Sequence, residues 1–116
     1  MVLWWRENSN RLAPEVRDAI AHADVAYVSA ASAWEVAIKM RLGKLRIPGP
    51  FERGVRDSGF TPLPIEFHHA ELVAELPDHH TDPFDRMLVA QAQAEGLTLV
   101  THDRAIQPYR IAVLWV

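Results

Sequence analysis

The chain has 116 residues, of which 49% are hydrophobic and 23% charged, the size and composition of one globular domain with a substantial core. It has no cysteine, which excludes disulfides and thiolate-bound zinc, and a reducing cytoplasm is the expected location. The net charge of −3 excludes binding of nucleic acid over the whole surface, and the apolar start at residues 1–5 is too short for a signal peptide or a membrane span.

Helical and extended segments alternate along the chain, as a parallel α/β sheet requires. Gly43 and Gly96 are natural helix stops, and Pro62 with Pro64 would confine the extended segment around them to a sheet edge or to a role outside the hydrogen-bonded ladder. The predicted fold is therefore α/β with a central parallel sheet, in a single domain at residues 1–116. The predicted helices are 14–23, 31–42, 51–58, 66–76 and 83–95, and the predicted strands are 25–29, 60–65, 97–101 and 111–116.

Glu35 is an acid inside an otherwise apolar helical run. On the predicted helix it shares a face with Ala31, Ile38 and Leu42, so its carboxylate lies along an apolar stripe. A charge in such a place costs free energy unless it has a partner, and a metal ion would be one. The alternative is a surface ion pair with Lys39, four residues later. The position alone leaves both interpretations open.

Two further acids, Asp82 and Asp85, stand at the start of the next long helix. Asp82 is a good N-cap and is followed by proline at the first helical position, so a structural role explains it better than a ligand role. Asp85 shares its helix face with Leu88, Val89 and Ala92, which would turn it toward the body of the protein. Asp85 is therefore the better ligand candidate.

Asp103 follows the apolar strand at 97–101, and open parallel sheets bind ligands beyond the carboxyl ends of their strands. The alternative is an N-cap for a short turn through Ile106. If Glu35, Asp85 and Asp103 converge, they offer the hard oxygen ligands that Mg²⁺ or Mn²⁺ takes. The three acids together point to a divalent-metal nuclease.

The histidines include two adjacent pairs, His68-His69 and His79-His80. Neighbouring residues in a helix do not face each other, so neither pair is expected to clamp a metal, and we predict loop or surface positions for both. The four tryptophans are expected to be core or interface residues, since tryptophan in a small domain mainly supplies buried area.

Five segments together resemble the PIN-domain ribonucleases, specifically the VapC-like toxins of toxin–antitoxin pairs. They occur in the family's order and span nearly the whole chain, so the resemblance is more specific than any one motif. It implies a PIN-like three-layer fold, hydrolysis of RNA phosphodiesters that depends on Mg²⁺ (or Mn²⁺), a cognate antitoxin that occupies the acidic groove, and a homodimer. The segments are VSAASAWEVAIK (28–39), LGKL (42–45), GFTPLPI (59–65), DPFDRMLVAQA (82–92) and LVTHD (99–103).

By this resemblance the catalytic and metal-binding acids are Glu35, Asp85 and Asp103, and Asp82 is an auxiliary ligand. Four basic residues are candidates for holding the RNA backbone, which affects affinity more than sequence choice. The alternative for them is a solvated helix end and loop. These four residues are Lys39, Arg41, Lys44 and Arg46.

The chain departs from the family at its start. Members begin with a short apolar strand that ends in Asp-Thr-His or similar, and that aspartate is a principal metal ligand; here residues 1–5 match the helix that follows it. We therefore expect a sheet that lacks its usual first strand, so that the strands at 25–29 and 97–101 have no shared partner. A start codon assigned too late, a truncated inactive relative, or a gap closed by other strands or another subunit would each explain the departure.

The expected activity of the chain as it stands is weak or absent. Two further hypotheses follow from other classes of protein. One is a degenerate PIN module that binds an antitoxin or a partner subunit without cutting RNA. The other is a Mg²⁺-binding domain of the phosphate-receiver type, which this chain fits poorly because it lacks paired acids at the end of a first strand.

Overall fold

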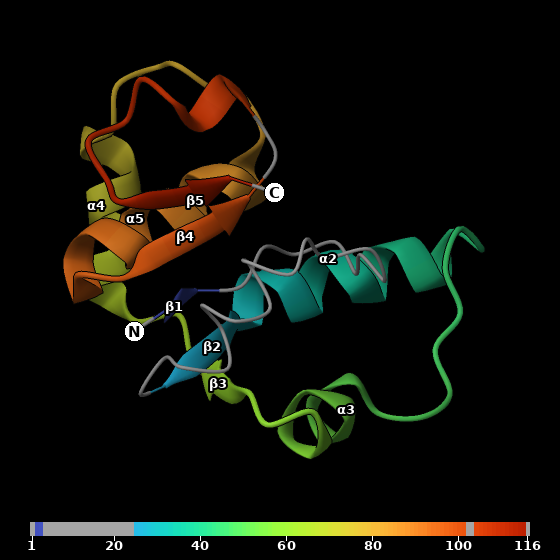
Figure 1. The fold of residues 1–116 in the computed structure, drawn as a ribbon. Helices are drawn as coiled ribbons and strands as arrows, with labels where there is room; N and C mark the ends of the chain where they lie inside the picture. The colour runs from blue at the N-terminus through green and yellow to red at the C-terminus, as the bar shows by residue number, and fades with distance from the viewer. Residues whose placement is uncertain (1, 4–24, 102–103, 116) are drawn as a thin grey trace.

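The computed structural model describes residues 2–3, 25–101 and 104–115; the predicted helix at 14–23 and Asp103 lie outside them. Within this part of the chain one parallel sheet has the strand order β3-β2-β1-β4-β5 (Figure 1). The strands are β1 (Val2–Leu3), β2 (Ala26–Ser29), β3 (Thr61–Leu63), β4 (Thr98–Thr101) and β5 (Val113–Trp115), and the helices are α2 (Ala30–Arg41), α3 (Phe51–Asp57), α4 (Phe67–Glu75), α5 (Pro83–Glu95) and a 3-10 turn η1 (Arg104–Ile106).

The α/β class and the alternation of helices and strands between residues 25 and 115 are confirmed, with boundaries within a few residues of the prediction. Strand β3 pairs only with β2 and lies at one edge of the sheet. Pro62 is tolerated there because an edge strand has one side without ladder hydrogen bonds. Helix α5 begins at Pro83 and ends at Gly96, whose φ of +64° is the left-handed conformation that favours glycine.

The first strand, which the sequence predicts to be missing, is present but reduced to two residues. Strand β1 occupies the centre of the sheet, where Val2 pairs with Ala26 of β2 on one side and with Thr98 of β4 on the other. Two extended residues suffice for this because a central strand forms a ladder with both neighbours at once. The strand has two residues against four in each neighbour, so the central ladder is short and the sheet remains an abbreviated one.

Helix α5 lies at the middle of the hydrophobic core. It contacts α4, α2 and strand β4, and its residues Leu88, Val89 and Gln91 are fully buried although they point in different directions around the helix. A helix that is buried on all sides must be packed by neighbours throughout its circumference. The core around it is completed by Leu76, Leu97, Leu99, Ile106 and Tyr109.

Ser29, the last residue of β2, is the N-cap of α2: its Oγ accepts a hydrogen bond from Ala31 N–H and donates one to Oε1 of Gln91 on α5. The C-terminal half of α2 extends away from the sheet (Figure 1). No strand in the described part of the sheet covers this half, so Ile38 and Leu42 are 38% and 62% exposed. The predicted apolar stripe is therefore wrong at these two positions. Among the described residues, no helix combines the length and hydropathy that crossing a bilayer requires.

Candidate functional site

Two of the predicted metal-binding acids are buried in the structure. Glu35 on α2 is 8% exposed and Asp85 on α5 is 1% exposed. Glu35 is therefore a buried residue and not a surface one. The prediction that Asp85 turns toward the body of the protein is confirmed. Both carboxylates are thus withdrawn from bulk water, where a bound cation would offset the cost of burying negative charge.

The residues that precede these two acids are in contact with each other. Trp34 meets Phe84 edge to face, with ring centroids 5.0 Å apart. The contact sets α2 against the first turn of α5, which is the turn that carries Asp85. Trp34 is nevertheless 61% exposed, so it packs at the protein surface and not in the core. Trp4 and Trp5 lie outside the described residues.

Asp82 is the N-cap of α5, as the sequence predicts. Its Oδ1 accepts hydrogen bonds from the backbone N–H groups of Phe84, at 2.8 Å, and Asp85, at 3.2 Å. These bonds satisfy two of the helix's first donors. The cap accounts for the position of Asp82 without a metal, and its auxiliary ligand role stays a prediction.

His80 is a residue at this site that the sequence did not single out. Its Nδ1 accepts a hydrogen bond from the Asp82 backbone N–H at 3.0 Å, and its Nε2 lies 3.0 Å from Oδ2 of Asp85. The prediction of a loop position is correct, but the ring is largely buried against a candidate ligand. Its place just before an N-cap is the only signal in the sequence, and that place does not reveal the contact.

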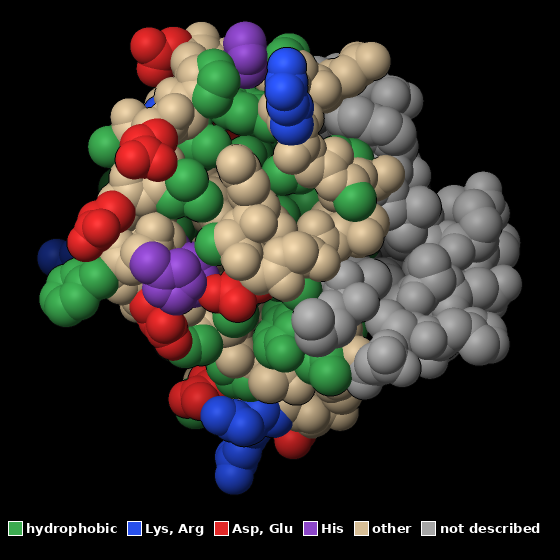
Figure 2. All heavy atoms as spheres, turned by 90° about the vertical axis from the view of Figure 1, so that its left-hand side faces the viewer, with side chains coloured by type: hydrophobic (Ala, Val, Ile, Leu, Met, Phe, Trp, Pro, Cys, Tyr) green, Lys and Arg blue, Asp and Glu red, His purple; other side chains and the backbone are tan. Residues whose placement is uncertain are grey.

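The other histidine pair meets at the C-terminal end of α5. The Nε2 atoms of His68 and His69 lie 2.9 and 2.8 Å from the same oxygen, Oε1 of Glu95. Figure 2 shows a histidine beside acidic side chains on the face over α4. These hydrogen bonds hold the pKa of the Glu95 carboxyl below its ordinary value of 4.5, and the bond from His68 has the larger effect. The predicted surface position is wrong for His69, which is 1% exposed.

The two histidines and Glu95 are close enough to hold a metal ion, although neither adjacent pair is expected to clamp one; that expectation stays a prediction. The hydrogen bonds nevertheless favour a different role. Nδ1 of His69 accepts from the backbone N–H of Glu66, so Nε2 carries the ring proton and donates it to Glu95. A histidine that ligates zinc normally donates from its other nitrogen. The cluster of His68, His69 and Glu95 therefore links α4 to α5 by hydrogen bonds.

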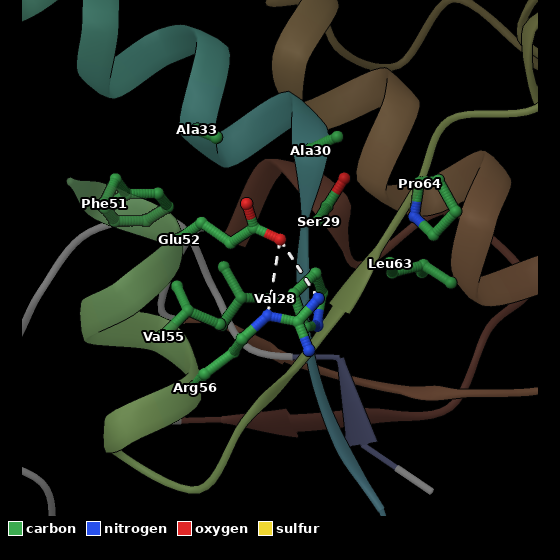
Figure 3. Close-up of a pocket in the computed structure, with 11 residues that line it drawn as sticks. Val28, Ser29, Ala30, Ala33, Phe51, Glu52, Val55, Arg56, Leu63 and Pro64 are labelled. Atoms are coloured by element: carbon green, nitrogen blue, oxygen red, sulfur yellow. Dashed lines mark hydrogen bonds and ion pairs between the residues drawn. The ribbon is translucent and has the colours of Figure 1, made fainter.

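A cavity of about 440 Å³ lies between the ends of β2 and β3, the start of α2, and α3 (Figure 3). Its lining is mainly apolar, with Phe51 and Val55 on α3 facing Leu63 on β3, while Arg56 pairs with Glu52 at 3.0 Å. Neither Glu35 nor Asp85 lines it. The cavity and the buried acids are separate features.

The donor chemistry at the acids fits a divalent cation of the Mg²⁺ type. Glu35 and Asp85 supply carboxylate oxygens, the ligands that such ions prefer. Ser32, one turn before Glu35 on the same face of α2, has a buried Oγ that finds no hydrogen-bond partner among the described residues. A buried polar atom of this kind calls for an explanation, and a coordinated ion or water is one of them. Asp103 follows β4 by two residues and lies outside the described part of the chain.

The comparisons with known proteins agree with this architecture. The model of the PIN domain family matches residues 2–112, and the chain belongs to that family. The chain is 32% identical to Ribonuclease VapC22 of Mycobacterium tuberculosis (strain ATCC 25618 / H37Rv) over 114 residues, which cover 92% of this chain and 85% of the relative. The predicted VapC-like membership is thus confirmed.

Among solved structures, the chain is similar to one described as the crystal structure of FitAcB from Neisseria gonorrhoeae. The TM-score is 0.67 with 19% sequence identity, and the match covers 98% of this chain and 96% of the other. At this identity the similarity concerns the fold alone. It confirms the predicted PIN-like α/β architecture with a central parallel sheet.

Proposed function

We propose that this chain is a Mg²⁺- or Mn²⁺-dependent endoribonuclease, the toxin of a toxin–antitoxin pair. The observation that carries the proposal is the burial of two carboxylates, Glu35 and Asp85, on helices that contact each other within a PIN domain related to a ribonuclease. Burying a carboxylate costs free energy, and a bound cation is one way to offset that cost.

In this proposal Glu35, Asp85 and Asp103 hold the ion, and Asp82 shapes the first turn of α5. When bound, the ion supplies Lewis-acid stabilisation of the charge that develops on the phosphate during hydrolysis. Glu35 and Asp85 would hold it from two helices, and Asp103 follows β4 by two residues in the sequence. The short central strand β1 is followed by Trp4, Trp5 and Arg6, so no acid extends this set from the end of β1. We therefore expect low activity.

The RNA backbone would contact the basic residues near the end of α2. Arg41, Lys44 and Arg46 are exposed and Lys39 is half-buried, so three of the four are open to a polyanion. Phosphate contacts of this kind fix the position of the substrate and weaken as salt increases. The expected contribution is to affinity for RNA in general, since a phosphate carries no base identity.

We infer from the family relationship that the partners are a cognate antitoxin and a second copy of the chain, in the cytoplasm. The surface supports association, because Trp34, Leu42 and Phe67 are large apolar side chains exposed to solvent. Large exposed apolar side chains commonly mark protein contacts. If the chain binds an antitoxin but does not cleave RNA, the alternative applies: it is a degenerate PIN module that acts only by binding.

Cleavage of a mixed RNA pool in Mg²⁺ or Mn²⁺, with EDTA as the blank, tests the proposal. Glu35→Gln and Asp85→Asn keep the side-chain shape and remove the charge, and each should reduce the cleavage rate by more than the roughly 10- to 100-fold that the loss of an outer-shell partner costs. Glu52→Gln, at an exposed glutamate outside the site, is the matched control and should cut as the wild type does. A folded wild type that never cuts RNA would leave only the degenerate module.

A further inference from the structure

The loop between α4 and α5 places one histidine ring against a buried candidate ligand. The side chain of His80 is 13% exposed and that of Asp85 is 2% exposed, and the contact runs from Nε2 to Oδ2 at 3.0 Å. A contact between two largely buried polar groups is shielded from competing water, so it constrains both side chains more than a surface pair would.

The second ring nitrogen defines which atom of His80 donates. The Asp82 backbone N–H points at Nδ1 at 3.0 Å, and an N–H can only donate, so Nδ1 accepts and carries no proton. The proton of the neutral ring is therefore on Nε2, the atom that faces Asp85. The backbone of the N-cap residue thus fixes the tautomer of His80, and the tautomer makes the ring a donor to the carboxylate.

The loop that carries the ring is held at both ends. Arg86 on α5 donates from Nη1 to the carbonyl oxygen of Pro77 at 2.9 Å, where the loop begins. At the other end, Oδ1 of Asp82 accepts from the first N–H groups of α5. The backbone that carries His80 is therefore fixed. Little further conformational entropy is lost when Nε2 of the ring donates a hydrogen bond to Asp85.

We propose that His80 is a positioning residue for metal binding: it donates from Nε2 to Oδ2 of Asp85 and so fixes the rotation of that carboxylate toward the ion. The inference rests on the proposed function, because it concerns how one of its ligands is oriented. Carboxylates that bind metals are commonly held by outer hydrogen bonds of this kind. His80 itself does not coordinate the ion.

Two substitutions separate this role from a purely structural one. In His80→Gln, the amide nitrogen reaches the place of Nε2 and can still donate to Asp85, while the acceptor for Asp82 N–H is lost. In His80→Asn, the amide oxygen takes the place of Nδ1 and keeps the bond to Asp82, while the shorter side chain at position 80 no longer reaches Asp85. If His80 only shapes the loop, His80→Gln should bind Mn²⁺ more weakly and His80→Asn should not. If His80 positions Asp85, His80→Asn should be the variant that binds Mn²⁺ more weakly.

The measurement is the dissociation constant for Mn²⁺ by calorimetry, on the full chain, with urea unfolding of the metal-free proteins to show that each is folded. His80→Asn should raise the dissociation constant by about 10- to 100-fold. His80→Gln should stay within a few-fold of the wild type. His79→Ala, at the neighbouring histidine whose ring lies against Tyr109, is the matched control and should bind as the wild type does.

Equal Mn²⁺ affinity for the wild type and His80→Asn would overturn the inference while the proposed function stands. A weakened His80→Gln beside an unaffected His80→Asn would also overturn it, in favour of the loop role. A folded wild type that binds no Mn²⁺ would reject the proposed metal site itself, and that result is recognisable because it appears before any variant is compared.

Discussion

Trp34 and Phe84 pack edge to face across α2 and α5, with their ring planes at 75° and their centroids 5.0 Å apart. Each of them directly precedes an acid of the candidate site, Glu35 on α2 and Asp85 on α5. The aromatic contact therefore links the two backbone segments that carry these ligands. It provides a way to disturb the relative placement of the acids without changing either of them.

Replacing Trp34 with alanine should weaken Mn²⁺ binding several-fold, because α2 is then less tightly positioned against the first turn of α5. The free energy of unfolding should fall by only about 0.5–1.5 kcal/mol, the usual worth of an aromatic pair. Calorimetry with Mn²⁺ and urea unfolding measure the two effects. Met40→Ala, at another exposed apolar residue of α2, is the control and should change neither. Unchanged Mn²⁺ affinity in Trp34→Ala would show that this contact does not position the acids.

The cap and ligand roles of Asp82 can be separated by two substitutions. Asp82→Ala removes the acceptor for Phe84 and Asp85 N–H and should lower the free energy of unfolding by about 1 kcal/mol. Asp82→Asn keeps an oxygen at the same place, so stability should be nearly retained, and Mn²⁺ affinity should be retained as well. A stable Asp82→Asn protein with tenfold weaker Mn²⁺ binding would restore Asp82 to the ligand set.

Arg86 joins α5 to the C-terminal end of α4. Its guanidinium donates to the carbonyl oxygens of Val73, Leu76 and Pro77 and to the hydroxyl of Tyr109. These carbonyl acceptors lie in the last turn of α4, at its C-cap and in the loop that follows, so this one side chain holds that whole segment against α5. Arg86→Ala should lower the free energy of unfolding by about 2–4 kcal/mol, since hydrogen bonds to a charged group contribute about 1.5–3 kcal/mol each and water replaces some of them.

Urea unfolding at neutral pH measures this effect. Arg86→Lys keeps the charge but not the planar fork, so it should recover only part of the loss. Arg56→Ala is the control: its exposed pair with Glu52 should contribute less than about 1 kcal/mol. A loss in Arg86→Ala no larger than that of the control would mean that water replaces these hydrogen bonds fully.

Glu95 should make stability depend on pH through its contacts with His68 and His69. Its pKa is lowered in the folded protein, so the stabilisation is fully present above the ordinary value of 4.5 and is lost as the pH falls through the lower folded value. Glu95→Gln keeps the shape and one acceptor oxygen but cannot ionise. The variant should be less stable than the wild type at pH 7, and the difference should shrink below pH 4.5.

Urea midpoints at a series of pH values measure this difference. Glu75→Gln, at an exposed glutamate of α4, is the matched control and should give a small difference at every pH. If the difference in urea midpoint between the wild type and Glu95→Gln stayed constant down to acid pH, the charge of the Glu95 carboxylate would not contribute to its contacts with His68 and His69.

The sequence by itself determined the features that depend on local chemistry. Pro83 and Gly96 delimit α5, Asp82 caps it, and Pro62 keeps β3 out of the middle of the sheet, because each acts through its own backbone or the next few residues. The order of five family segments also identified the PIN domain, since a match over the whole chain requires many positions to agree at once.

Only the tertiary structure decided the features that depend on contacts between distant segments. Val2 and Leu3 are too few residues for a sequence pattern to predict a strand. They form one because β2 and β4 pair with them on both sides. His69 is buried because α4 packs on α5, and His80 faces Asp85 because the loop before α5 folds back on it. Adjacency in the chain does not encode any of these contacts, whereas packing creates them.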